Sequence, residues 1–132
     1  MKNRITFVFI DDIREIPRNE FKYGVAIRDF KSAIEYLSTY ANDFPIVVSF
    51  DHDLGEEKTG YDIAKYIVEH QIPLVGFRIH SANPVGKFNI QQLLTHYGYK
   101  EIWFFKKNMI KYIYKVNKIK KLEGLIWKIM KN

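Results

Sequence analysis

The sequence predicts a three-layer α/β domain with a parallel sheet, and three observations carry that prediction. Short apolar runs alternate along the chain with longer segments whose apolar residues recur at helical spacing. Several of these runs end in Asp or His, which is typical of buried strands whose carboxyl ends form a site. With 132 residues, 47% of them hydrophobic, the chain is long enough to bury one core. Strands that alternate with helices favour a parallel sheet covered on both faces.

Five segments are predicted to form strands, because each is a run of apolar, β-branched or aromatic residues. They are residues 5–10, 23–27, 46–50, 74–79 and 102–105. The first two are separated by about a dozen residues rich in charge and containing Pro17, with no helical pattern. We therefore expect a loop in place of the first crossover helix, which leaves one face of the sheet thinly covered near Asp11 and Asp12.

Four segments carry helical patterns between and after these strands. They begin after Asp29, at Tyr61, at Pro84 and at Met109, and they extend to about residues 43, 70, 97 and 130. Asn83 is a good helix cap and Pro84 fits the first turn, while Gly98 ends that helix. The last stretch, about residues 108–131, is a long amphipathic helix whose apolar stripe suits packing on the sheet. Residues 1–132 thus form a single domain with its core in residues 5–107.

Composition excludes several classes of protein. The chain has no cysteine, so it has neither disulfides nor thiolate metal sites, which fits a reducing cytoplasm. The apolar run near the start is too short for a signal peptide and is interrupted by Asp11 and Asp12. No stretch approaches the roughly 20 apolar residues needed to span a bilayer.

The positive charge is concentrated at one end of the chain. Residues 1–97 carry 11 Lys and Arg against 13 Asp and Glu, a net charge of −2, whereas residues 98–132 carry 10 Lys against 2 Glu, a net charge of +8. Such a segment could attract a nucleic acid, a nucleotide or an anionic membrane. We favour a solvated lysine face, because the segment contains no arginine, the better bidentate phosphate ligand.

Acidic residues gather where the predicted strands end. Asp11 and Asp12 follow the first strand, and Asp51 follows the third, with Asp53 two residues later. Any one of these could simply cap a helix or pair with a lysine. Together they suit a hard divalent cation, Mg²⁺ or Mn²⁺, which is held by carboxylates, water and phosphate.

Two histidines, His52 and His80, follow the third and fourth strands. A lone histidine at such a position is often a hydrogen-bonded core residue. A pair on neighbouring strands could act as general base and general acid, or one could be a nucleophile, with Asp51 as a further catalytic residue.

Phosphate-binding groups are predicted around the same edge. The candidates are Arg14, Ser81, Asn83, Gly86 and Lys106. Ser81 and Asn83 could donate to a phosphate oxygen, and Gly86 permits close backbone approach at a helix N-terminus. Arg14 could clamp the phosphate or form a surface ion pair.

The chain resembles a known family at these residues. Asp11-Asp12, Asp51, Ser81 and Lys106 are similar to the acidic pair, phospho-acceptor, hydroxyl and lysine of response-regulator receiver domains. The segments IDDIREIP, SFDHDLGEEKTGYDIA and IHSANPVG more closely resemble cyclic-phosphate-processing receiver-like domains, over about residues 5–97. The resemblance implies a flavodoxin-like fold with strand order 2-1-3-4-5 and without the first helix.

The resemblance also implies a hydrolase that acts on cyclic phosphates or cyclic nucleotide signals. We therefore expect a metal-assisted phosphoesterase for a small nucleotide ligand, without a membrane span. One alternative is a protein that sequesters a cyclic nucleotide without hydrolysing it, a property that would serve a phage against nucleotide-based host defence. Another is a signalling receiver phosphorylated on Asp51.

Overall fold

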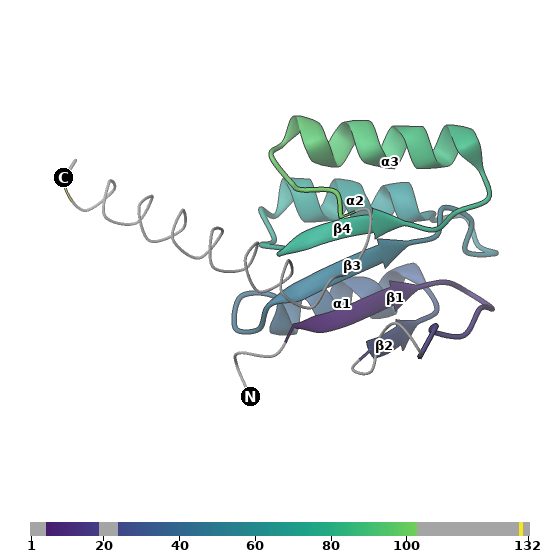
Figure 1. Ribbon diagram of the computed structural model, residues 1–132, viewed down its shortest axis with the longest axis horizontal. Helices are drawn as coiled ribbons and strands as arrows, with labels where there is room; N and C mark the ends of the chain where they lie inside the picture. Colours follow the sequence, from purple (N-terminus) through teal and green to yellow (C-terminus); the bar gives the residue numbers. More distant parts are fainter. Residues whose placement is uncertain (1–4, 19–23, 103–129, 131–132) are drawn as a thin grey trace.

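The computed structural model describes residues 5–18, 24–102 and 130 of the chain. In chain order the elements are β1 (Thr6–Ile10), β2 (Gly24–Ile27), α1 (Phe30–Tyr40), β3 (Ile46–Phe50), α2 (Gly60–Glu69), β4 (Gly76–Ile79) and α3 (Pro84–His96). The strands form one parallel sheet in the order β2-β1-β3-β4 (Figure 1). The predicted α/β class, the parallel sheet and this part of the strand order are confirmed.

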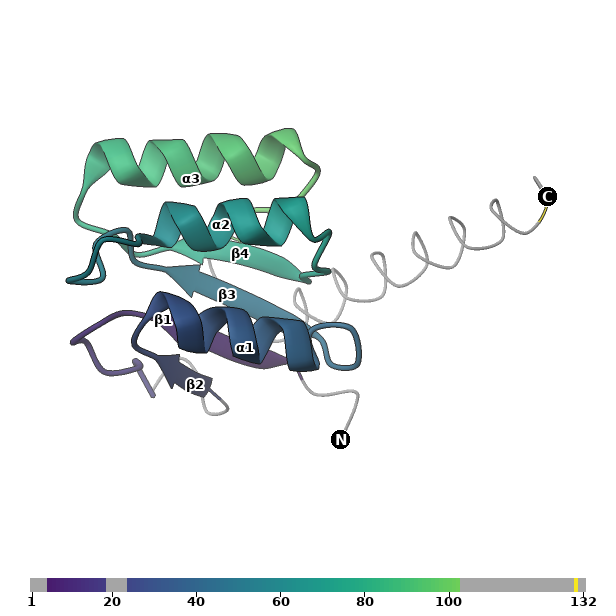
Figure 2. The ribbon, with the colours of Figure 1, turned by 180° about the vertical axis from the view of Figure 1, so that it is seen from behind.

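One face of the sheet carries the main core. The buried side chains of Val8, Val48 and Phe77 lie on that face and pack in one cluster with buried residues of α1, α2 and α3. Figure 2 shows the three helices side by side in front of the sheet. The amphipathic patterns of these helices in the sequence are explained by this burial.

The opposite face of the sheet carries a smaller core of Phe7, Phe9, Val47 and other residues, including Ile16 from the loop after β1. Residues 11–18, which follow β1, contain no helix, as predicted for the first crossover. The helix predicted at about 108–131, which would complete a third layer, falls outside the described residues.

The helix boundaries agree closely with the capping signals. Asp29 accepts a hydrogen bond from the backbone N–H of Ser32 and begins α1, and Asn83 accepts one from Gly86 and begins α3. Thr59 and Asp62 form a capping box at the start of α2. Gly98, just after α3, has a φ of +89°, a conformation that glycine adopts without strain.

The fifth predicted strand is described only at its beginning. Glu101 forms a parallel bridge with Phe77, and backbone hydrogen bonds join Phe77 to Lys100 and Ile102 at 2.9 and 2.7 Å. The chain therefore returns to the outer edge of β4, where a fifth strand is expected. Residues 103–105 lie outside the described part. No helix among the described residues is long and apolar enough to cross a membrane.

Candidate functional site

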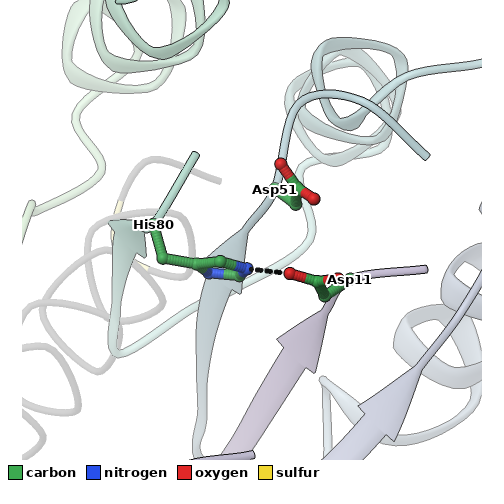
Figure 3. Close-up of side chains that lie close together, drawn as sticks. All are labelled: Asp11, Asp51 and His80. Atoms are coloured by element: carbon green, nitrogen blue, oxygen red, sulfur yellow. Dashed lines mark hydrogen bonds and ion pairs between the residues drawn. The ribbon is translucent and has the colours of Figure 1, made fainter. Parts of the chain in front are cut away.

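The candidate site lies at the carboxyl edge of the sheet, where three strands each contribute one side chain. Phe9, Ser49 and Arg78 are register partners on β1, β3 and β4. Because side chains alternate along a strand, the residues two positions further on continue toward the same face. Those residues are Asp11, Asp51 and His80. Figure 3 shows their side chains converging at the ends of the strands.

Asp11 is fully buried and held by several hydrogen bonds. Its Oδ1 accepts the backbone N–H groups of Ile13 at 3.0 Å and Arg14 at 2.8 Å, and its Oδ2 accepts a hydrogen bond from Nε2 of His80 at 3.0 Å. Burial alone raises the pKa of Asp11, but these hydrogen bonds outweigh it and leave that pKa below its ordinary value. Asp11 is therefore a carboxylate.

The imidazole of His80 is restrained on three sides. Its ring stacks on Phe9 with centroids 4.2 Å apart, Nδ1 lies 2.7 Å from Oγ of Ser49, and Nε2 faces Asp11. Burial is the main cause that lowers the pKa of His80, so the ring is neutral at pH 7. Because the Asp11 carboxylate can only accept, the hydrogen-bond network assigns the proton to Nε2 and makes Nδ1 the acceptor for Ser49.

Asp51 is partly buried beside the other two side chains. Burial raises its pKa, and the negative charge of Asp11 raises it further. One ligand atom each from Asp11, Asp51 and His80 lie within 4.8 Å of one another. In the part of the chain that the structure describes, this is the group of acidic and histidine side chains arranged closely enough to hold a metal ion.

The donor set fits a divalent cation. The carboxylates of Asp11 and Asp51 supply the hard oxygen ligands and the negative charge that such a cation needs. A cation would also offset the repulsion between the two carboxylates, which raises the pKa of Asp51. An imidazole nitrogen is a ligand that transition metals accept more readily than Mg²⁺ does.

Arg14 reaches back over this group. Its Nη1 donates to the backbone carbonyl of His80 at 3.1 Å, and its Nε lies 3.9 Å from Oδ2 of Asp11. The Arg14 side chain is 53% exposed, so its guanidinium faces both the site and solvent. Arg28 in turn donates to the carbonyls of Asp11 and Arg14 and pairs with Glu15, which holds the loop after β1 in place.

A pocket of about 220 Å³ opens beside His80 and Arg14 on the face of the sheet opposite α1, α2 and α3. It is lined by Phe7, Phe9, Arg14, Glu15, Pro17, Ser49, Arg78 and His80. The lining thus combines apolar side chains with two arginines and one glutamate, so it offers both apolar and charged contacts to a small ligand.

His52 lies in a different set of contacts from His80. Its Nδ1 is 3.0 Å from Asp53 and 3.4 Å from the side-chain amide of Asn83. Its ring packs against Gly86 so closely that a Cβ there would lie 2.3 Å from the imidazole. The sequence grouped the two histidines by their strand ends, but it could not tell that their neighbours differ.

The groups predicted to bind phosphate at the start of α3 have structural partners. Oγ of Ser81 accepts the backbone N–H of Asn83 at 3.1 Å. Asn83 caps α3 by accepting the backbone N–H of Gly86 at 3.0 Å, so that N–H is already used. Substrate binding by Ser81, Asn83 and Gly86 stays a prediction. Lys106 lies outside the described residues.

The remaining predicted metal ligands, Asp12 and Asp53, are not part of the group formed by Asp11, Asp51 and His80. Asp12 lies against the loop at Gly55, where an added Cβ would be 3.0 Å from its carboxylate. Asp53 accepts from Asn83 at 3.3 Å and is bonded to His52. Metal binding by either one stays a prediction.

Three residues of the site were not anticipated from the sequence. Ser49 interrupts an otherwise apolar strand, and this could have marked it as functional. Arg28 directly follows β2, a signal shared with many surface residues. Phe9 carries no distinguishing signal, because its stacking on His80 depends on how the strands are ordered.

Comparison with known proteins matches residues 6–96 to the family described as the cyclic-phosphate processing receiver domain. No curated protein and no solved structure matches the chain. The matched segment runs from β1 through α3 and contains Asp11, Asp51 and His80. It agrees with the family resemblance of the acidic pair, the SFDHDLG segment and the HSANPVG segment. The chain belongs to the cyclic-phosphate processing receiver domain family.

Proposed function

We propose that the chain is a metal-assisted phosphoesterase that opens a cyclic phosphate on a nucleotide. The observation that carries this proposal is the group of Asp11, Asp51 and His80 at the carboxyl edge of the sheet. Its ligand atoms are close enough for one cation, and it lies in a member of a cyclic-phosphate processing family.

Asp11, Asp51 and His80 would hold the cation through one carboxylate oxygen each and Nε2 of the imidazole. The imidazole favours Mn²⁺ over Mg²⁺ as the ion. When bound, a divalent cation supplies Lewis-acid polarisation of a phosphoryl oxygen and neutralises charge on it. The low pKa of Asp11 keeps one ligand charged, and the raised pKa of Asp51 makes this carboxyl the one that gains most from a positive partner.

Arg14 would bind the phosphate. Its guanidinium is anchored by the carbonyl of His80 at 3.1 Å, which leaves further N–H donors for phosphate oxygens. The pocket bounded by Arg14, Arg78 and Phe9 would take the organic part of the ligand next to the cation group.

We assign proton transfer to His52 rather than to His80 because of how their ring nitrogens are bonded. His80 uses both ring nitrogens within the protein, whereas His52 is paired at Nδ1 with Asp53. Hydrogen bonds from His52 and Asn83 lower the pKa of Asp53, so this residue stays a carboxylate that can orient the imidazole ring of His52.

Hydrolysis would add one water across the ring ester. The water oxygen forms the new bond to phosphorus and loses a proton to a base, and the ester oxygen that leaves takes up a proton and becomes a hydroxyl. His52 would serve these proton transfers, while Arg14 would hold the phosphate in line.

The proposal predicts different losses for the two histidines. Turnover of a panel of 2′,3′-cyclic, 3′,5′-cyclic and cyclic dinucleotide phosphates is followed by ³¹P NMR with Mn²⁺, and Mn²⁺ binding is measured separately by calorimetry. We expect His52→Gln to lose at least about 100-fold in turnover while keeping Mn²⁺ affinity, and His80→Gln to lose both.

The matched control is His96→Gln, at the exposed end of α3, which should turn over like wild type. If His52→Gln and His80→Gln both hydrolyse every accepted substrate at the wild-type rate, the proposed roles are wrong. Retention of intact ligand after long incubation would identify a sequestering protein instead. Acetyl-phosphate labelling that disappears in Asp51→Asn would identify a phosphorylated receiver.

A further inference from the structure

Ser49 is an unexpected residue in the middle of the sheet. It is the second-to-last residue of β3, whose other members are Ile46, Val47, Val48 and Phe50, and it is only 1% exposed. Burying a hydroxyl without a hydrogen-bond partner destabilises the fold, whereas an apolar side chain at this position would carry no such penalty. The hydroxyl therefore needs a compensating contact.

That contact is with His80. Oγ of Ser49 lies 2.7 Å from Nδ1 of the imidazole, and the opposite ring nitrogen lies 3.0 Å from Asp11. The result is a continuous chain of hydrogen bonds from β3 through His80 to β1. Both ends are buried, since Asp11 is 0% exposed and Ser49 is 1% exposed.

We propose that Ser49 is a positioning residue that fixes the orientation of His80 and pairs with its Nδ1 atom in either tautomer. Only the part of this proposal that concerns a bound cation rests on the proposed function. Without a cation, Ser49 donates to Nδ1, and Nε2–H donates to the Asp11 carboxylate. This arrangement follows from the hydrogen-bond geometry alone.

With a cation bound, Nε2 of His80 has to offer its lone pair as a ligand. The single ring proton must then sit on Nδ1, and the hydroxyl of Ser49 can accept it. A hydroxyl is both donor and acceptor, so Ser49 supports either tautomer by rotating its O–H bond. Outer contacts of this kind fix the orientation of a ligand histidine and raise metal affinity.

Two substitutions at position 49 differ in whether they keep the hydroxyl group. Ser49→Ala leaves Nδ1 without a partner, and Ser49→Thr keeps the hydroxyl on a β-branched side chain that suits a strand. The pair of variants separates loss of the hydroxyl from a general disturbance of the core. Thr is therefore the rescue variant for Ala.

The test uses the full chain labelled with ¹⁵N at histidine, and it records the ring nitrogen shifts of His80 with and without Zn²⁺, a diamagnetic cation. In wild type and Ser49→Thr we expect Nε2 to be protonated without Zn²⁺ and Nδ1 to be protonated with it. In Ser49→Ala without Zn²⁺ we expect Nε2 to stay protonated, because Asp11 still accepts its proton, and the Nδ1 shift to change, because Nδ1 has lost its hydrogen-bond donor. We also expect Zn²⁺ affinity to fall about 10- to 100-fold in that variant.

A Ser49→Ala protein with the wild-type Nδ1 shift and the wild-type Zn²⁺ affinity would overturn the proposal. A wild-type protein in which Nδ1 is protonated without a cation would also overturn it. If wild type binds no Zn²⁺, the cation site of the proposed function fails. In that case, the role of Ser49 is still decided by comparing the His80 ring nitrogen shifts of Ser49→Ala and wild type without Zn²⁺.

Discussion

At the scale of single residues, the candidate site places two acids in unequal environments. Asp11 has hydrogen bonds that stabilise its charge, and their effect on its pKa exceeds that of burial. Asp51 lies beside it, and burial and the charge of Asp11 both raise the pKa of Asp51. The charge on Asp51 is therefore unfavourable to the fold whenever no cation is present.

Removing that charge should stabilise the metal-free protein. The folded pKa of Asp51 lies above its unfolded value, so ionised Asp51 lowers stability at neutral pH, and this penalty disappears as pH falls through the raised pKa. We expect Asp51→Asn to raise Tm at pH 7 in EDTA by up to a few degrees. The difference from wild type should shrink toward pH 4, as measured by calorimetric melting.

The control for this substitution is Asp43→Asn, at an exposed position after α1. It should leave Tm unchanged across the same pH range. An Asp51→Asn protein that is less stable than wild type at pH 7 without cation would show that Asp51 is favourably paired in the folded state.

The sequence predicted Asp11, Asp51 and His80 because each directly follows a buried strand. Side-chain alternation also implied that only some of the strand-end acids could face one pocket. Which of them do so depends on the register of three strands that are distant in sequence. Ser49 was not predicted: it is the polar residue of an otherwise apolar strand, but its partner, His80, is known only once β4 is placed beside β3.

At the scale of secondary structure elements, the start of α3 is fitted against His52. A Cβ on Gly86 would lie 2.3 Å from one ring carbon of His52 and 2.5 Å from another. Glycine is not required here for its backbone conformation, because Gly86 lies in the helix α3. The position needs the absence of a side chain.

We expect Gly86→Ala to destabilise the protein by about 1–3 kcal/mol through this overlap. The double variant Gly86→Ala with His52→Ala should recover most of that loss, because the clashing ring is gone. Urea unfolding of the two single variants and the double variant gives the coupling energy.

Gly60 provides the contrasting case. A Cβ there would lie 2.0 Å from the backbone carbonyl oxygen of Asp51. We therefore expect Gly60→Ala to be destabilising and not to be rescued by His52→Ala.

If the losses in unfolding free energy of Gly86→Ala and His52→Ala simply add in the double variant, the packing described for His52 is contradicted.

The loop after β1 depends on Arg28, which donates to the carbonyls of Asp11 and Arg14. A lysine keeps the charge but cannot provide the two-pronged donor geometry of a guanidinium. We expect Arg28→Lys to increase hydrogen exchange at the amides of Ile13 and Arg14 about tenfold, as measured by NMR. Arg18→Lys, which alters an arginine bonded to Gly24, is the control. Equal exchange in wild type and Arg28→Lys would show that the loop is held by other contacts.

The elements themselves were largely predictable. Apolar runs predicted the strands, and Asp29, Asn83 and Gly98 marked helix ends through capping chemistry that acts over a few residues. Observed strands are slightly shorter, as for β4, which begins at Gly76 rather than residue 74. The position of Arg28 over the first loop was not predictable, because it depends on β2 lying beside β1.

At the scale of the whole molecule, the sheet separates the main core from the candidate site. Helices α1, α2 and α3 cover one face, while Asp11, Asp51, His80 and the pocket follow the side-chain rows of the other (Figures 1 and 3). Residues 11–18, which contain no helix, give Arg14 its position over the site.

The central claim is that Asp11, Asp51 and His80 form one divalent cation site, and titration of the full chain with Mn²⁺ in a calorimeter tests it most directly. We expect one Mn²⁺ per chain in wild type and in the Asp43→Asn control, with affinity reduced at least about tenfold in both Asp51→Asn and His80→Gln. Equal Mn²⁺ affinity in wild type and both site variants, or no binding by wild type, would contradict the claim.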